Sequence, residues 1–249
     1  MRAAVFDSGI GGLTVVKSLL KHKLFEEIIY FGDTARVPYG SKDKNTIIRY
    51  SLEALEFFKN FNVDILITAC NSVSSYAIPE LRKNAPFLVV GVIEAGVLAL
   101  KREIKDKNSN ILIIGTNATI SSQKYQKLLK KEGFFNIEAK PTGLFVPIVE
   151  EGIFKGEVLD ATMRYYFKDI KKPDAIILGC THFPLIAKEI KRYFNDEVTL
   201  IHSGEAIVEH LKKDYSLNTK FEETKLKLFA SENPEKLKDV ANRWLKGKF

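Results

Sequence analysis

Residues 64–72 read DILITACNS, and residues 174–182 read DAIILGCTH. Both stretches begin with Asp, continue as an apolar run of strand length, and end in a cysteine followed by hydrogen-bonding residues. The two cysteines of the chain, Cys70 and Cys180, therefore occupy matching positions in two distant parts of the sequence. Ligands of open α/β sheets bind just beyond the carboxyl ends of the strands. We expect two chemically equivalent thiols that face one ligand.

Two further landmarks repeat at nearly the same offset. Asp7 and Thr116 each follow a short apolar run, and their separation differs from that of the two cysteines by a single position. Val37-Pro38 precedes Val146-Pro147 by the same interval that separates Asp7 from Thr116. Three loop positions that recur in the same order indicate an internal duplication. The sequence thus predicts an α/β fold with two similar open-sheet domains related by pseudo-symmetry and an active site in the cleft between them.

The remaining chain alternates strand-like and helix-like segments. We expect strands at residues 28–31, 88–92, 111–114, 198–202 and 226–230, and helices at residues 45–60, 73–83, 94–104, 122–131, 206–213 and 234–245. Pro79 is expected to start or interrupt the helix at 73–83.

Composition excludes some classes of protein and leaves others open. The net charge of +7 is compatible with a nucleic-acid-binding module, but the lysines are spread among Asp and Glu residues, as on a solvated basic surface. The longest apolar stretch, residues 87–100, carries Glu94 and is too short to span a bilayer. No secretory signal precedes the first apolar run, so we expect a cytoplasmic protein without membrane contact. A reducing cytosol also disfavours a disulfide.

Residues 7–14, DSGIGGLT, join a strand-like run to a helix-like pattern. Glycines let the backbone approach a ligand closely, and the free N–H groups of a helix start favour a phosphate or a carboxylate. The dinucleotide fingerprint requires glycine where Thr14 stands, although Asp33 lies near the expected place of a ribose-binding acid. Carboxylate binding, dinucleotide binding and a tight turn without a ligand all remain open here.

A pair of thiols across a small ligand suits a particular reaction. An unperturbed cysteine has a pKa of about 8.5, so a small fraction is thiolate at neutral pH. One thiolate and one thiol supply a base on one face of a carbon and an acid on the other, which is what inversion of configuration requires. Zinc binding by Cys70, Cys180 and His182 is an alternative, but no Cys-x-x-Cys or comparable pairing is present, and we expect no metal.

Four motifs carry a resemblance to a known family. They are residues 7–14 (DSGIGGLT), 38–40 (PYG), 68–72 (TACNS) and 179–184 (GCTHFP). Together they resemble the signatures of bacterial glutamate racemase, a cofactor-independent member of the aspartate/glutamate racemase superfamily. The resemblance runs from residue 1 to about residue 210.

The resemblance implies two α/β domains, the first formed by residues 1–95 plus about 208–249 and the second by residues 96–207. It implies interconversion of L- and D-glutamate for peptidoglycan synthesis, without a cofactor. We expect a homodimer, although no motif in the sequence determines the oligomeric state. The thiol that matches Cys70 takes the proton from D-glutamate, and the one that matches Cys180 takes it from L-glutamate. Asp7, Glu150 and His182 match residues that assist the thiols.

The same resemblance implies a set of substrate-binding positions. They are Ser8, Tyr39, Gly40, Asn71, Ser72, Thr116, Thr119 and Thr181. The family usually has threonine where Ser72 stands, so this contact would persist through the hydroxyl group alone.

Three classes of function remain open from the sequence. They are cofactor-free racemisation of an amino acid, an enzyme that binds a dinucleotide or phosphate at residues 9–12, and a basic nucleic-acid-binding module that has no catalytic activity. Relatives that act on aspartate or hydantoins also use paired cysteines, so the reaction type is better determined than the substrate side chain.

Overall fold

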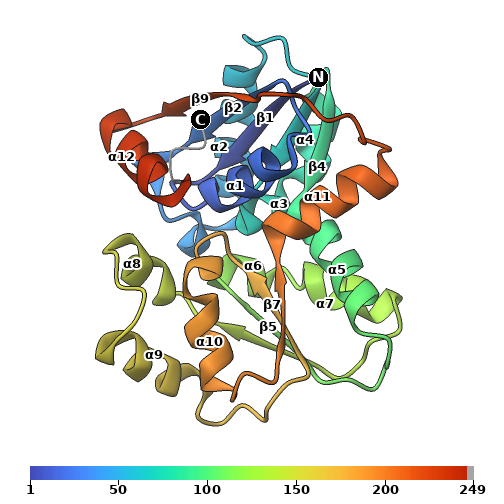
Figure 1. Ribbon diagram of the computed structural model, residues 1–249, viewed down its shortest axis with the longest axis vertical. Helices are drawn as coiled ribbons and strands as arrows, with labels where there is room; N and C mark the ends of the chain where they lie inside the picture. Colours follow the sequence, from blue (N-terminus) through green and yellow to red (C-terminus); the bar gives the residue numbers. More distant parts are fainter. Residues whose placement is uncertain (246–249) are drawn as a thin grey trace.

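The computed structural model describes residues 1–245 as two parallel sheets with helices on both faces of each (Figure 1). The first sheet consists of β1 (Arg2–Asp7), β2 (Glu27–Gly32), β3 (Ile65–Thr68), β4 (Leu88–Gly91) and β9 (Lys225–Ala230). The second consists of β5 (Ile111–Gly115), β6 (Ile137–Pro141), β7 (Ala175–Gly179) and β8 (Thr199–His202). Parallel strands need helical crossovers, and the chain alternates strand and helix accordingly.

The two sheets share one strand order. The first runs β4-β3-β1-β2-β9, and the second runs β8-β7-β5-β6 when it is read in the same direction. Strands β1 to β4 and β5 to β8 therefore take equivalent places, and β9 is an addition at the β2 edge. The predicted α/β fold with two similar open sheets is confirmed.

Twelve α-helices surround the sheets in the described residues. They are α1 (Leu13–His22), α2 (Lys44–Phe58), α3 (Asn71–Tyr76), α4 (Ile78–Asn84), α5 (Val92–Glu103), α6 (Asn117–Ser121), α7 (Lys124–Lys131), α8 (Phe145–Glu150), α9 (Glu157–Phe167), α10 (Ala187–Tyr193), α11 (Ser203–Asp214) and α12 (Pro234–Leu245). Short 3-10 helices lie at Thr34–Arg36, Tyr39–Ser41 and Phe183–Ile186. Every helix of residues 1–245 is too short or too polar to traverse a lipid bilayer.

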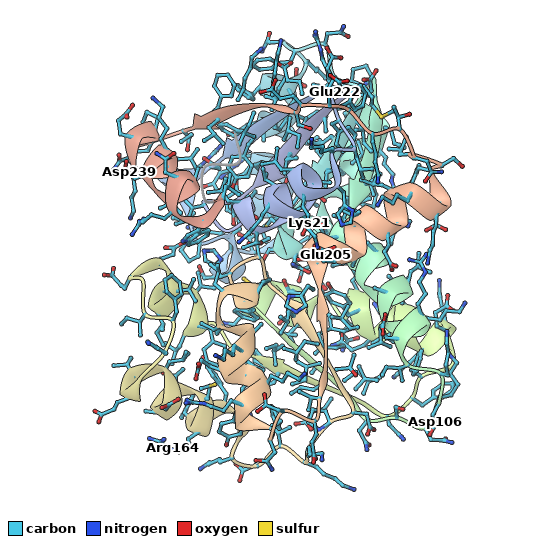
Figure 2. All side chains as sticks on the ribbon, viewed as in Figure 1. Lys21, Asp106, Arg164, Glu205, Glu222 and Asp239 are labelled. Atoms are coloured by element: carbon cyan, nitrogen blue, oxygen red, sulfur yellow. The ribbon has the colours of Figure 1, made fainter. Side chains whose placement is uncertain are left out.

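One apolar core joins the halves. It combines β1 side chains such as Val5 with β5 and β7 side chains such as Ile113 and Ile177, and α5 and α11 lie between them. Lys21 of α1 and Glu205 of α11 are 3.3 Å apart at the rim of this packing (Figure 2). Each sheet has one further apolar core on its other face. This shared apolar core thus joins the two halves of the chain.

The expected elements differ from the observed ones in three places. The helix expected at 73–83 is divided into α3 and α4 at Ala77, because Pro79 lacks the N–H that a continuous helix would need there. The helix expected at 122–131 is α7, which the separate α6 precedes, and Gln123 adopts a left-handed conformation between the two. Strand β6 and helices α8, α9 and α10 were not expected. The exposed, charged pattern of β6 explains its omission.

The two Val-Pro landmarks lie in topologically matching segments with different local structure. Pro38 precedes a 3-10 helix after β2, whereas Pro147 lies inside α8 after β6. The C-terminal β9 pairs with β2, and α12 packs on β9 and α1, so the end of the described chain returns to the first sheet. The residue boundaries of the two domains stay a prediction.

Candidate active site

Cys70 and Cys180 line a single cavity between the two sheets. Cys70 stands two residues beyond β3, and Cys180 directly follows β7, so each thiol lies at the carboxyl end of a matching strand. The cavity is narrow and partly open to solvent. Both cysteines are buried and free of disulfides. The topology therefore brings together two thiols from distant parts of the chain.

Most residues that the sequence singled out line this cavity with the thiols. They are Ser8, Tyr39, Gly40, Asn71, Ser72, Thr116, Glu150, Thr181 and His182. Asp7 and Thr119 do not line it, and both are buried directly behind it. Asp7 accepts hydrogen bonds from the Gly9 N–H at 3.0 Å and the Thr181 hydroxyl at 3.3 Å. Asp7 thereby connects the first half of the chain to the second Cys motif.

A histidine and a carboxylate stand in line behind Cys180. Nδ1 of His182 is 3.7 Å from Sγ of Cys180, and Nε2 of the same ring is 3.1 Å from Oε1 of Glu150. Burial lowers the pKa of His182, but its hydrogen bonds with Cys180 and Glu150 outweigh that effect and raise the pKa to about 10. Burial opposes ionisation of Glu150, yet the contact with His182 keeps the pKa of this carboxyl below its usual value. His182 therefore places an imidazolium, charged at neutral pH, within 3.7 Å of the Cys180 sulfur.

Cys70 has a different environment. Its thiol donates to the Ser8 hydroxyl at 3.5 Å, and no histidine stands beside it at the corresponding position, which Ser72 occupies. Burial and the negative charge of Asp7 raise the pKa of Cys70 to about 12. Burial also raises the pKa of Asp7, although the charge of His182 acts in the opposite direction. Cys70 is therefore a thiol at neutral pH while Cys180 stands beside a cation.

The glycine-rich loop after β1 makes room for protein side chains. A Cβ atom on Gly11 would lie 2.4 Å from Oγ1 of Thr181 and 2.6 Å from Cε1 of His182. A Cβ atom on Gly40 would lie 2.4 Å from Cβ of Thr116. These contacts are shorter than van der Waals separations, so glycine allows the two halves to approach each other around the cavity.

This packing argues against the dinucleotide interpretation of residues 7–14. Asp33, the expected ribose-binding acid, is fully buried and accepts hydrogen bonds from Nε of Arg36 at 2.6 Å, from the Ser231 hydroxyl at 2.7 Å and from the Tyr39 hydroxyl. Its oxygens are committed to protein donors, and a ribose has no access to them. Over residues 1–245, no three His, Cys, Asp or Glu side chains gather as a metal site.

Hydroxyl groups from both halves meet on one wall of the cavity. The Ser72 and Thr116 hydroxyls are 3.0 Å apart, and the Thr116 and Thr119 hydroxyls are 3.1 Å apart. Thr116 also caps α6 by accepting from the Thr119 N–H. Serine at position 72 reaches Thr116 with the hydroxyl group that it shares with the family's usual threonine. Small hydroxyl side chains of this kind fix carboxylate and ammonium groups by hydrogen bonds.

The sequence-based prediction missed three supporting interactions. The Thr14 hydroxyl donates to the Thr181 carbonyl at 2.8 Å and so ties α1 to the second Cys motif. The Tyr125 hydroxyl donates to Oδ1 of Asn71 at 2.7 Å, and Asp33 accepts from Tyr39. The first two interactions join residues that are far apart in the sequence, and Asp33 acts on the site only through Tyr39. Thr14 had a local signal, since it stands at the position that breaks the dinucleotide fingerprint, whereas Tyr125 had none.

Comparison with known proteins places this site in a family. The model of the Asp/Glu/hydantoin racemase family matches residues 15–211. The chain is 70% identical over 249 residues to glutamate racemase from a Nitratiruptor species, covering 100% of this chain and 98% of the relative. It is 56% identical over 245 residues to glutamate racemase from Campylobacter jejuni subsp. jejuni, with 98% of each chain covered.

Solved structures agree with the sequence comparison. The crystal structure of glutamate racemase from Campylobacter jejuni subsp. jejuni has a TM-score of 0.98 to this chain at 55% identity, with 99% of each chain covered. Glutamate racemase from Francisella tularensis subsp. tularensis, whose crystal structure is a complex with D-glutamate, has a TM-score of 0.86 at 34% identity, with 98% of this chain and 93% of that chain covered.

The site has two buried thiols in one cavity between duplicated α/β sheets. This arrangement and the matches above identify the class of protein as a racemase. The chain belongs to the Asp/Glu/hydantoin racemase family. It is an amino-acid racemase, an isomerase. The relatives reported above are glutamate racemases, and they match this chain over nearly their whole length.

Proposed function

We propose that this enzyme interconverts L-glutamate and D-glutamate with two cysteines as acid and base and without a cofactor. The observation that carries this proposal is the placement of Cys70 and Cys180 at equivalent strand ends on one cavity. The substrate is supported by the relatives, which are glutamate racemases at up to 70% identity in the comparisons above.

In the proposed reaction, the Cys180 thiolate removes the α-proton of L-glutamate from one face of the carbon. The Cys70 thiol then gives its proton to the opposite face, which yields D-glutamate and leaves Cys70 as thiolate and Cys180 as thiol. The reverse reaction starts from Cys70. In this proposal the imidazolium of His182, 3.7 Å from the Cys180 sulfur, faces the negative charge that the thiolate carries in the first direction.

The carbanion that forms between the two proton transfers requires stabilisation by the protein. Hydroxyl groups of Ser8, Ser72, Thr116 and Thr181 line the cavity and offer hydrogen bonds to a carboxylate. The thiols themselves are 6% and 7% exposed, so little bulk water competes for these donors. In this proposal Asp7, Glu150 and His182 adjust the proton affinity of the thiols.

The biological part of the proposal is the supply of D-glutamate for peptidoglycan synthesis by a cytoplasmic homodimer. Two free thiols fit a reducing compartment. Exposed apolar side chains on the segment of α8 and α9, namely Leu144, Val158 and Tyr165, offer a surface for a second copy. Sedimentation of the wild type and of Val158→Glu tests the dimer. A monomeric wild type would rule it out.

The test of the reaction is circular dichroism on L-glutamate and on D-glutamate without added cofactor. We expect loss of optical activity from both directions, and a much slower reaction with aspartate. In deuterated water, early product from either enantiomer should carry deuterium at Cα, because the acid that protonates the carbanion exchanges with solvent. Product that keeps the original hydrogen would rule out two separate bases.

A further inference from the structure

Tyr125 lies between the two cysteine loops without lining the cavity itself. It is 1% exposed and belongs to α7, which packs on α5 beside the second sheet. Its ring fits against two glycines: a Cβ atom on Gly96 would lie 3.3 Å from Cε1, and a Cβ atom on Gly179 would lie 3.4 Å from Cε2. Gly179 is the residue before Cys180. The ring is therefore fixed by close packing next to one thiol.

The hydroxyl of Tyr125 reaches the residue that follows the other thiol. It donates to Oδ1 of Asn71 at 2.7 Å, and Asn71 is 2% exposed. Burial raises the pKa of Tyr125, so its hydroxyl keeps the proton that it donates. A carboxamide has its acceptor oxygen and its NH₂ group on opposite sides. The hydrogen bond to the oxygen therefore fixes the direction in which the NH₂ group points.

The Asn71 amide is hydrogen-bonded through its oxygen, but its NH₂ group is unpaired among the described residues. Nδ2 is buried and has no hydrogen-bond partner among the described residues, and Asn71 lines the cavity that holds both thiols. Buried polar groups in proteins are nearly always paired, so this unpaired donor on the cavity wall needs an acceptor that the described part of the protein does not supply. An amide NH₂ group without a protein partner suits a carboxylate oxygen.

We propose that Tyr125 is a positioning residue, which holds the Asn71 amide with its NH₂ group toward the cavity, where it donates to a carboxylate oxygen of the substrate. This inference rests on the proposed glutamate racemisation. Tyr125 itself does not contact the substrate, because it acts through Asn71. Without its hydroxyl, the Asn71 amide is free to turn and present its oxygen to the carboxylate, which weakens binding.

The test is the kinetics of Tyr125→Phe, which removes one oxygen atom and keeps the ring. We expect KM for L-glutamate and for D-glutamate to rise roughly threefold to tenfold, the range of one net hydrogen bond, while kcat stays within about twofold. Thr224→Val is the matched control, because it removes a buried hydroxyl that donates to the Phe25 carbonyl at 2.7 Å, at the opposite end of the first sheet. We expect it to keep the wild-type KM.

A double-mutant comparison separates positioning from general stability. In an Asn71→Ala background, Tyr125→Phe should change KM by less than about twofold, because the amide that it orients is gone. Gly96→Ala is a second variant that retains every polar group and crowds the ring, and KM should rise in it as well. Thermal unfolding of each variant reports whether the chain folds.

The outcomes are distinguishable. A wild-type KM in both Tyr125→Phe and Gly96→Ala overturns the positioning role, as does an equal rise in KM with and without the Asn71 side chain. A fall in kcat alone, parallel to a loss of thermal stability, also overturns it. A wild-type enzyme that fails to racemise glutamate overturns the proposed function instead, before any variant is compared.

Discussion

Cys70 and Cys180 follow strands that hold the same place in two sheets of the same order, yet their surroundings differ. Cys180 has His182 at 3.7 Å, which Glu150 in turn contacts. Cys70 has a serine hydroxyl at 3.5 Å and the buried carboxyl of Asp7 nearby. The duplication placed two thiols at matching positions, but one stands beside a charged imidazole and the other beside a buried carboxyl that raises its pKa. Equivalent backbone positions therefore do not give the two thiols equivalent surroundings.

A second difference concerns what each sheet carries at its edge. β9 extends the first sheet next to β2, and no described strand extends the second sheet beyond β6. Because Ala230 pairs with Gly32, the following residue, Ser231, meets Asp33, which also accepts from Tyr39 on the cavity wall. The added strand thus supports the Cys70 side of the site.

The largest effect is expected from removing either thiol. Cys70→Ala and Cys180→Ala should each lower net racemisation by about 10³-fold or more, because each face of the carbon loses its acid or base. Circular dichroism from both enantiomers measures this. A single variant that racemises at the wild-type rate would show that its thiol has no part in the proton transfer.

The close approach of the halves is the next target. Gly11→Ala places a methyl group against Thr181 and His182, and we expect activity to fall by about 10-fold to 100-fold and the free energy of unfolding by about 1–3 kcal/mol. Gly143→Ala is the control, since a Cβ atom there has nothing within 4 Å. Steady-state rates and thermal unfolding of the pair check the expectation. Equal behaviour of the two variants would contradict it.

The asymmetry of the thiols predicts a change in pH dependence. Glu150→Gln removes the negative charge that favours protonated His182, so the raised pKa of His182 should fall and the alkaline limb of kcat/KM should move to lower pH by about one unit. Glu151→Gln, at the exposed neighbouring position, should leave the profile unchanged. A profile that Glu150→Gln does not shift would show that the contact of Glu150 with His182 does not control this limb of the pH profile.

The smallest effect is expected at the added strand. Ser231→Ala removes one of the donors to buried Asp33 and should lower the free energy of unfolding by about 1 kcal/mol, with kcat within about twofold of wild type. Urea denaturation measures the first quantity and circular dichroism the second. Unchanged stability would mean that Asp33 does not depend on the C-terminal strand.

Much of the fold followed from local patterns. Apolar runs that end in small polar residues predicted the strands that precede Cys70 and Cys180, because buried parallel strands are nearly continuous apolar runs and ligands bind beyond their carboxyl ends. Strand β6 was missed because its side chains are half-exposed, so its sequence has no buried face to reveal it. Pro79 predicted that the helix at 73–83 would start or be interrupted near it, because its ring disrupts a continuous helix, but it did not locate the break at Ala77.

The candidate site divides in the same way. His182 is two residues from Cys180, so a short window of sequence contains both. Tyr125 and Asn71 are 54 residues apart, and Thr14 and Thr181 are 167 apart, so no such window contains either pair. The glycines of residues 9–12 suggested a ligand, whereas the structure shows them against Val37, Thr181, His182 and Asp7.

By itself, the sequence determined the two thiol-bearing strand ends, the duplicated order of elements and the chemical types available to the site. These depend on the period and polarity of neighbouring residues, which operate over a few positions. Only the tertiary structure decided that the thiols share one cavity, that Cys180 alone stands beside a charged histidine, and that the Tyr125 hydroxyl meets Asn71. Those relations depend on how the two sheets pack, because burial and long-range proximity set the proton affinity and the direction of each polar group.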